Sequence, residues 1–201
     1  MVTALWRAAL GCLAVTMVTV CFLSRRPGTD AVDYFSYFTI LSNLVGAAAL
    51  LAGTVPAWRS RRWLDWLRGA AALYLAITGI VYAVLMGGEA AHWTGWVQHR
   101  IMPVAMPLDW LLIAPAGRLP TWRTLLGWLA FPLGYLVYTL AHGAATSWYP
   151  YPFLNAARYG YTVVTGYTIG IAATFVVFAA LLLGAANRAV PQVRERRAAV
   201  S

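Results

Sequence analysis

The chain carries little charge and no lysine. Only 10% of its 201 residues are charged and all fifteen basic residues are arginine, whereas a soluble domain usually has about 25% charged residues. We interpret the missing lysine as a compositional bias. The net charge of +9 does not predict a nucleic-acid partner, because the arginines lie in short stretches between apolar runs. With 61% hydrophobic residues and a mean hydropathy of +0.66, the sequence predicts a membrane protein.

Residues that bind metals are also scarce. The two cysteines, Cys12 and Cys21, lie in the same apolar run at a spacing unsuited to a disulfide, so we interpret them as buried apolar side chains. A thiolate metal site is thereby excluded. His92, His99 and His142 have no metal-binding spacing. Signature motifs of soluble enzymes are absent as well. We therefore expect neither a metal nor a cofactor.

Long apolar segments dominate what remains and predict an all-α integral membrane bundle of six transmembrane helices. The first is expected to be a retained helix and not a signal peptide, because arginines follow it at once and no small-residue cleavage site precedes them. We expect one domain over 1–187 and a basic cytoplasmic tail over 188–201. The six segments are 4–23, 34–54, 69–87, 98–115, 122–143 and 160–186.

The arginines predict the orientation of this bundle. With six spans, eleven of them fall on the side of the two termini and four on the other side, so the positive-inside rule puts both termini in the cytoplasm of a cell membrane. Tryptophans flank the spans, as interface anchors do. The eleven are Arg7, Arg59, Arg61, Arg62, Arg68, Arg118, Arg123, Arg188, Arg194, Arg196 and Arg197, and the four are Arg25, Arg26, Arg100 and Arg158.

Polar side chains within the apolar segments gather towards the outer side. Ser36, Thr39 and Asn43 share one face of a helix and should face other helices or a wet cavity, since hydrocarbon offers polar groups no partner. Tyr135 and His142 lie on a polar face of the fifth segment. The loop WYPYPFLN, residues 148–155, contains two prolines and four aromatic residues and predicts an interfacial cap over this end of the bundle.

Asp109 is a carboxyl inside the fourth segment. It follows His99 by ten residues, about 15 Å along a helix and so near the bilayer midplane. A carboxylate at that depth is costly, which makes Asp109 a functional candidate. We expect it to face the bundle interior, either protonated or paired with Tyr or Thr hydroxyls.

By themselves, Thr39 and His99 suit ordinary structural roles. A threonine in a membrane helix commonly bonds the carbonyl one turn back, which for Thr39 is that of Phe35. A histidine at the end of a span, such as His99, is commonly an interfacial hydrogen-bonding group.

Three motifs give these residues a further interpretation. GWVQHRIMPVAMP (95–107), GYLVYTLAH (134–142) and WYPYPFLN (148–155) resemble the androgen-induced-gene family of six-span membrane proteins, which includes the androgen-dependent TFPI-regulating protein and bacterial relatives. The similarity covers about residues 34–185, with motifs in consistent order. Gln98 replaces the Asn of the family pattern, and Met102 replaces its second His.

The resemblance implies an intramembrane hydrolase of fatty-acid esters of hydroxy fatty acids. Thr39 would be the nucleophile and His99 its general base, because a hydroxyl becomes reactive when a neighbouring imidazole removes its proton. A one-residue gap would instead align His99 with the second His of the family, and His142 remains a reserve base.

Several groups are candidates to hold the substrate. Ser36, Asn43 or a hydroxyl of Tyr135 or Tyr151 would support the oxyanion, and Arg100 or Arg158 would pair with a substrate carboxylate. The expected partners are a lipid ester and membrane lipids, and the oligomeric state is left open. The alternative hypotheses are a non-enzymatic carrier of lipids or small molecules with Asp109 as its proton or substrate site, and a structural assembly partner.

Overall fold

The computed structural model describes residues 2–113 and 115–198, with side chains up to residue 190, and this part of the chain is helical without strands. Its longer helices are α1 (Val2–Leu23), α3 (Phe38–Ala52), α4 (Arg62–Leu85), α6 (Met102–Leu112), α7 (Thr121–Thr146) and α8 (Ala156–Ala198). The short ones are α2 (Ala31–Phe35), η1 (Pro56–Trp58), α5 (Trp93–Trp96), the π-helix η2 (Val97–Ile101) and η3 (Pro152–Leu154).

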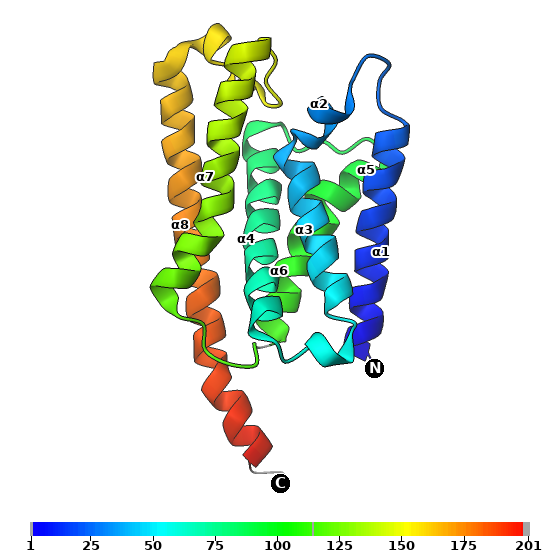
Figure 1. Cartoon of the computed structure of the whole chain (residues 1–201), viewed down its shortest axis with the longest axis vertical. Helices are drawn as coiled ribbons and strands as arrows, with labels where there is room; N and C mark the ends of the chain where they lie inside the picture. The colour runs from blue at the N-terminus through cyan, green and yellow to red at the C-terminus, as the bar shows by residue number, and fades with distance from the viewer. Residues whose placement is uncertain (1, 114, 199–201) are drawn as a thin grey trace.

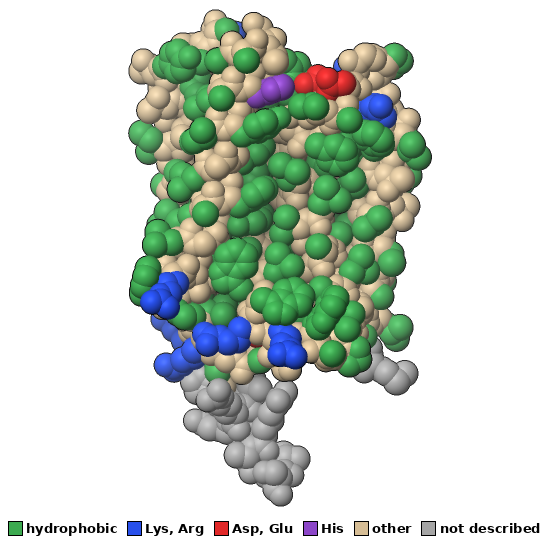
Figure 2. Space-filling view, viewed as in Figure 1, with side chains coloured by type: hydrophobic (Ala, Val, Ile, Leu, Met, Phe, Trp, Pro, Cys, Tyr) green, Lys and Arg blue, Asp and Glu red, His purple; other side chains and the backbone are tan. Residues whose placement is uncertain are grey.

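These helices form six legs that run alternately up and down the bundle: α1, α2–α3, α4, α5–η2–α6, α7 and α8 (Figure 1). The start of α1 and the end of α8 lie at the same end of the bundle. On the face shown in Figure 2, the largest group of basic side chains lies at this end, and acidic and histidine side chains lie at the other, with a few basic ones nearby. We call the two ends the basic end and the polar end.

Four of the helices, α1, α4, α7 and α8, are long and apolar enough to cross a bilayer. Together they confirm an all-α, membrane-embedded bundle. The prediction of six uninterrupted transmembrane helices is wrong, however, because the second and fourth predicted segments are broken into shorter helices.

The second segment breaks at Ser36 and Tyr37. The Ser36 hydroxyl donates to the carbonyl of Val32 at 2.7 Å and closes α2, and Tyr37 adopts an extended conformation (φ −79°, ψ 123°) before α3 begins. The remaining fifteen residues of α3 give a helix about 22 Å long, shorter than a ~30 Å hydrocarbon core. The break leaves the first turn of α3 inside the bundle.

The fourth segment contains the π-helix η2 directly before α6. Pro103 has no N–H to donate to the preceding turn, and its ring packs closely on Gly79 of α4, where an added Cβ would lie 2.7 Å from Pro103 Cβ. A π-turn of this kind shifts the register of the residues before it, including His99, and often occurs at functional sites. The segment ends at Leu112, three residues before the predicted boundary.

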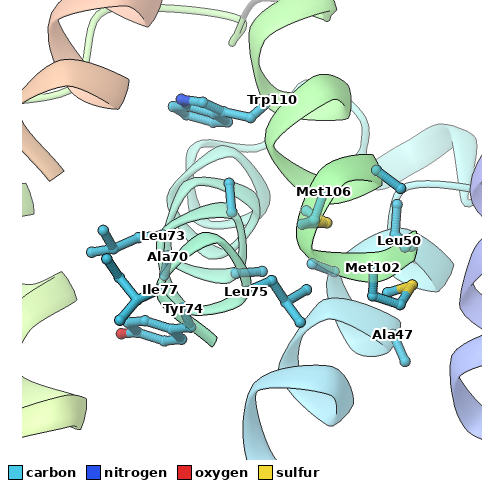
Figure 3. Packing of buried hydrophobic residues seen from close by; sticks show 14 of the residues in the cluster. Ala47, Leu50, Ala70, Leu73, Tyr74, Leu75, Ile77, Met102, Met106 and Trp110 are labelled. Atoms are coloured by element: carbon cyan, nitrogen blue, oxygen red, sulfur yellow. The ribbon is translucent and has the colours of Figure 1, made fainter. Parts of the chain in front are cut away.

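The core is built around α4, whose buried residues pack against α3 on one side and α6 on the other (Figure 3). Leu75 of α4 lies beside Met102 and Met106 of α6, and all three are inaccessible to solvent. The helices α7 and α8 expose far more of their side chains and complete the bundle on the other side of α4. The most closely packed part of the fold is thus α1, α3, α4 and α6.

Aromatic residues and cysteines complete the picture of the surface. Exposed tryptophans lie at both ends of the bundle, as interface anchors should: Trp58, Trp63 and Trp122 at the basic end, and Trp93 and Trp96 at the polar end.

The prediction that both cysteines are buried is wrong for Cys12, which is exposed, whereas Cys21 is half-buried.

The last helix does not stop where the predicted domain ends. It is kinked at Gly160, which has a positive φ of 77°, and continues past residue 187 to Ala198. Residues 199–201 of the predicted tail lie outside the described residues.

Candidate functional site

A cavity of about 480 Å³ lies between the α3–α4 side of the bundle and the helices α7 and α8. Most of its wall is apolar, and its hydroxyl and imidazole groups come from α2, α3 and the residue before it, α4, η2, α7, α8 and the loop around η3. Four of the predicted site residues, Thr39, His99, Tyr135 and Tyr151, line it together. The volume lies within the ~300–1,000 Å³ that small-molecule sites occupy.

Thr39 is the second residue of α3 and is buried, with 7% of its surface exposed. Its Oγ1 lies 3.2 Å from the Tyr151 hydroxyl, and its backbone N–H donates to the same hydroxyl at 3.1 Å. Burial raises the pKa of the Tyr151 phenol, so this group stays protonated and is able to donate to Thr39 Oγ1. In that arrangement the proton of Thr39 remains free for a base. The alternative bond from Thr39 to the carbonyl of Phe35 does not form.

The break before α3 gives Thr39 a favourable electrostatic position. The first N–H groups of a helix have no partner within the helix, and the aligned peptide dipoles place partial positive charge at this terminus. Phe38 and Thr39 lie at this terminus and line the cavity. Negative charge that develops on an atom beside Thr39 would therefore be stabilised.

His99 reaches the cavity from the π-helix η2. Its ring stacks on Tyr82, with centroids 3.7 Å apart and planes 10° apart. The Tyr82 hydroxyl donates in turn to the carbonyl of Glu89. Nδ1 of His99 is buried and has no hydrogen-bond partner in the described part of the chain. His99 and Thr39 share the cavity, but no hydrogen bond joins them there.

Two of the residues predicted to support an oxyanion lie elsewhere. Ser36 is buried and its Oγ is 2.6 Å from the Tyr138 hydroxyl, and the Asn43 side chain donates to the carbonyl of Thr39 at 2.8 Å. Neither borders the cavity. Both hold α3 and the break before it in place. Tyr135 borders the cavity, but its hydroxyl donates to the carbonyl of Ser36 at 2.8 Å.

The reserve base and the predicted substrate arginines also lie outside the cavity. His142 stacks on Tyr138, and its Nε2 is 3.7 Å from an oxygen of Asp33, too far for a hydrogen bond. Arg100 is exposed, donates to the carbonyl of Gly88 at 2.7 Å and lies over the Trp96 ring. Arg158 is exposed and lies over the Tyr159 ring. Of the two histidines, only His99 contacts the cavity.

Asp109 differs most from its prediction. It lies in the last turn of α6, near the basic end, and its carboxylate is paired with two arginines in place of Tyr or Thr hydroxyls. Arg7 of α1 donates to both oxygens, at 2.7 and 3.1 Å, and Arg68 of α4 donates at 2.9 Å. Asp109 does not border the cavity, so it has no contact with a ligand there.

Asp65 of α4 completes this group, which we call the charge cluster: Arg7, Asp65, Arg68 and Asp109. Its four side chains are each 5% exposed or less, and Asp65 lies 3.3 Å from Arg68. Arg68 also donates to the carbonyls of Asp109 and Ile113 at the end of α6, and the Asp109 carbonyl accepts from the Ile113 N–H as well. The cluster therefore ties α1, α4 and α6 together.

Sequence reasoning missed this cluster although a signal was present. Arg7 falls inside the first apolar segment, where an ionisable residue calls for a partner, and Asp65 and Arg68 are spaced one helical turn apart. No group of three or more His, Cys, Asp or Glu side chains suited to a metal ion occurs among the described residues.

The fold and site together define a membrane-embedded helical protein with an apolar cavity that carries a few polar groups at one end. Comparison of the chain with protein-family models, with curated proteins and with solved structures found no match.

Proposed function

We propose that the protein is an intramembrane hydrolase of lipid esters, with Thr39 as nucleophile and His99 as general base. The observation that carries the proposal is that Thr39, His99 and Tyr151, which lie on separate elements, line one apolar cavity in a membrane-embedded bundle. The resemblance to the androgen-induced-gene family adds the substrate class, fatty-acid esters of hydroxy fatty acids.

In the proposed reaction Thr39 Oγ1 attacks the ester carbonyl and its proton passes to His99. The oxyanion receives a hydrogen bond from the Tyr151 hydroxyl, which turns to it from Thr39 Oγ1 once that oxygen has bonded to the carbonyl carbon, and a second one from the Phe38 N–H at the start of α3. The intermediate collapses to an acyl-threonine, and the departing alkoxide takes the proton from His99. Water then attacks the acyl group and gives a proton to His99. His99 passes this proton to the departing Thr39 Oγ1, so the fatty acid is released and both residues return to their starting state. Since no hydrogen bond joins Thr39 and His99 in the free protein, the first transfer requires one bridging water or closure around the substrate.

The direct test is turnover of a panel of lipid esters, including hydroxy-fatty-acid esters, by the purified protein in lipid nanodiscs. The wild type should release fatty acid, and Thr39→Val, which keeps the branched shape and loses the hydroxyl, should not. Absence of turnover by the wild type on the whole panel would refute the hydrolase proposal and favour a carrier that binds lipid in this cavity without chemistry.

Tyr151→Phe should lower kcat about 10²- to 10³-fold, the usual cost of removing one oxyanion donor. The ring itself should stay in place, because it stacks on Phe153 and packs edge-on against Tyr37. Tyr74→Phe is the matched control, since it removes a buried tyrosine hydroxyl that donates to the carbonyl of Trp128 outside the cavity. Equal activity of the two variants would remove Tyr151 from the mechanism.

We further propose that all six legs cross a cell membrane with the basic end in the cytoplasm. The basic end carries the exposed Arg59, Arg61 and Arg62, which favour the cytoplasmic side by the positive-inside rule. Arg7 and Arg68 lie on the same side in the arginine count, but they are buried in the charge cluster. Ser60 and Ser147 are exposed and lie at opposite ends of the bundle. Single cysteines placed at these positions, in a protein from which Cys12 and Cys21 have been removed, should react differently with an impermeant thiol reagent applied to intact cells. Ser147→Cys should react and Ser60→Cys should not. The reverse pattern would invert the orientation.

A further inference from the structure

A second hollow lies beside the cavity, between α4 and α8. It has a volume of about 580 Å³ and is lined by apolar side chains of α4 and by the part of α8 from Val163 to Thr174. We call it the α4–α8 groove. Val81 of α4 and Ile171 of α8 line both the groove and the cavity, so the two spaces adjoin at these residues. Tyr167 of the groove also packs against Phe153 of the cavity, with ring centroids 5.9 Å apart.

The groove opens towards the surroundings of the bundle. Val84 and Val163, one on each wall, are 73% and 44% exposed, and in a membrane-embedded helix such residues face hydrocarbon. On α8, Gly166 and Gly170 lie one turn apart, and a Cβ added at either would meet nothing within 4 Å. The missing side chains therefore leave open space along this wall.

We propose that the acyl chain of the ester enters from the bilayer through the α4–α8 groove and lies in it while the ester carbonyl reaches Thr39. The identification of the chain as part of an ester rests on the proposed function. An acyl chain suits the groove because its lining is apolar apart from Tyr167 and Thr174, and the Thr174 hydroxyl already donates to the Gly170 carbonyl. Thr39, Tyr151 and His99, the groups that would act on the ester, lie in the cavity beyond. Glycines spaced like Gly166 and Gly170 also pair helices between chains, but a partner helix could not follow the groove into the cavity.

Gly170→Leu tests the proposal by filling the groove where the structure leaves room. Gly184→Leu is the matched control, because its added Cβ also meets open space on α8 and it lines neither hollow. Gly170→Leu should lower kcat/KM for long-chain esters about tenfold or more, the scale at which one excess group disturbs an apolar pocket. Hydrolysis of a butyryl ester, whose chain is too short to fill the groove, should be unchanged, as should every activity of Gly184→Leu.

A second measurement does not depend on turnover. A diazirine-labelled C16 fatty acid, photolysed with the protein in nanodiscs and mapped by mass spectrometry, should label the peptides of α4 and α8 that line the groove. Labelling should be lost in Gly170→Leu and kept in Gly184→Leu.

The outcomes separate this proposal from the proposed function. Unchanged long-chain hydrolysis in Gly170→Leu together with unchanged labelling would overturn the groove and leave the hydrolase intact. Labelling that Gly170→Leu abolishes, in a protein that hydrolyses no ester, would support the groove and refute the hydrolase. Failure of the wild type to label the groove would overturn the proposal, and so would conversion of a dimer to a monomer by Gly170→Leu with labelling unchanged.

Discussion

Replacing Thr39 with alanine should abolish ester hydrolysis, and replacing His99 with alanine should lower kcat about 10²- to 10⁴-fold, the usual contribution of a general base. The first variant lacks the attacking oxygen, and the second leaves the hydroxyl without a group to take its proton. The double variant should be little worse than Thr39→Ala, because members of one catalytic unit do not contribute additively. The measurement is hydrolysis of a hydroxy-fatty-acid ester by variants that elute as the wild type does on size exclusion.

Two further variants separate chemistry from packing. Thr39→Ser should keep partial activity, since it retains the hydroxyl but loses the methyl group that restricts its rotamer. Thr168→Ala removes another threonine that lines the same cavity and should leave kcat within a few fold of wild type. Full activity in Thr39→Ala would exclude Thr39 as the nucleophile.

The second large effect concerns stability. Asp109→Leu should destabilise the protein by about 3–5 kcal/mol, because it leaves Arg7 and Arg68 buried with only Asp65 to balance them. Asp109→Asn should be nearly as harmful, since it keeps the shape of the side chain but not its charge. A protonated, hydrogen-bonded carboxyl would instead tolerate asparagine well. Unfolding in mixed micelles, followed by tryptophan fluorescence, provides the measurement.

The charge cluster also makes a prediction about coupling. Arg7→Leu combined with Asp109→Leu leaves Arg68 and Asp65 as a neutral pair, so the double variant should be more stable than the sum of the single effects by about 0.5–3 kcal/mol. Asp33→Asn is a control at the polar end, where the carboxylate is partly exposed and lies 3.7 Å from Nε2 of His142. It should change stability by no more than about 0.5 kcal/mol. Strict additivity of the two leucine substitutions would contradict the cluster as a single unit.

Hydropathy alone predicts the helical content and the approximate position of every leg, because each long apolar run must satisfy its backbone internally in a membrane. It does not predict how a run is interrupted. The break at Ser36 and Tyr37 depends on a hydrogen bond from the Ser36 side chain and on the Tyr138 hydroxyl beside it, over one hundred residues later in the sequence. The π-helix before Pro103 depends likewise on the close fit of that ring against Gly79.

The candidate site, too, was predictable in part: the sequence predicts which residues lie together but not the hydrogen bonds that each one makes. The order and spacing of the motifs, together with depth counted along the helices, suffice to predict that Thr39, His99 and Tyr151 lie near each other. The roles of Asn43 and Ser36 were not predictable, since one helix turn decides whether a polar side chain faces a cavity or a neighbouring backbone. The prediction for Asp109 was wrong for a different reason. Its partners Arg7 and Arg68 are 102 and 41 residues away in the sequence, and counting residues along one helix reveals neither.

The same sequence separation constrains the order in which the protein is made. Arg7 belongs to α1, which leaves the ribosome before α6, the helix that carries its partner Asp109. Arg68 pairs with Asp65 in its own helix, but its ion pair with Asp109 also forms only after α6 has been made. An unpaired arginine costs about 2.5–3.5 kcal/mol at the centre of a membrane helix and less near its ends. In the proposed orientation, the position of the cluster at the basic end lets both arginines stay near the cytoplasmic headgroups during synthesis, until α6 is made and Asp109 pairs with them.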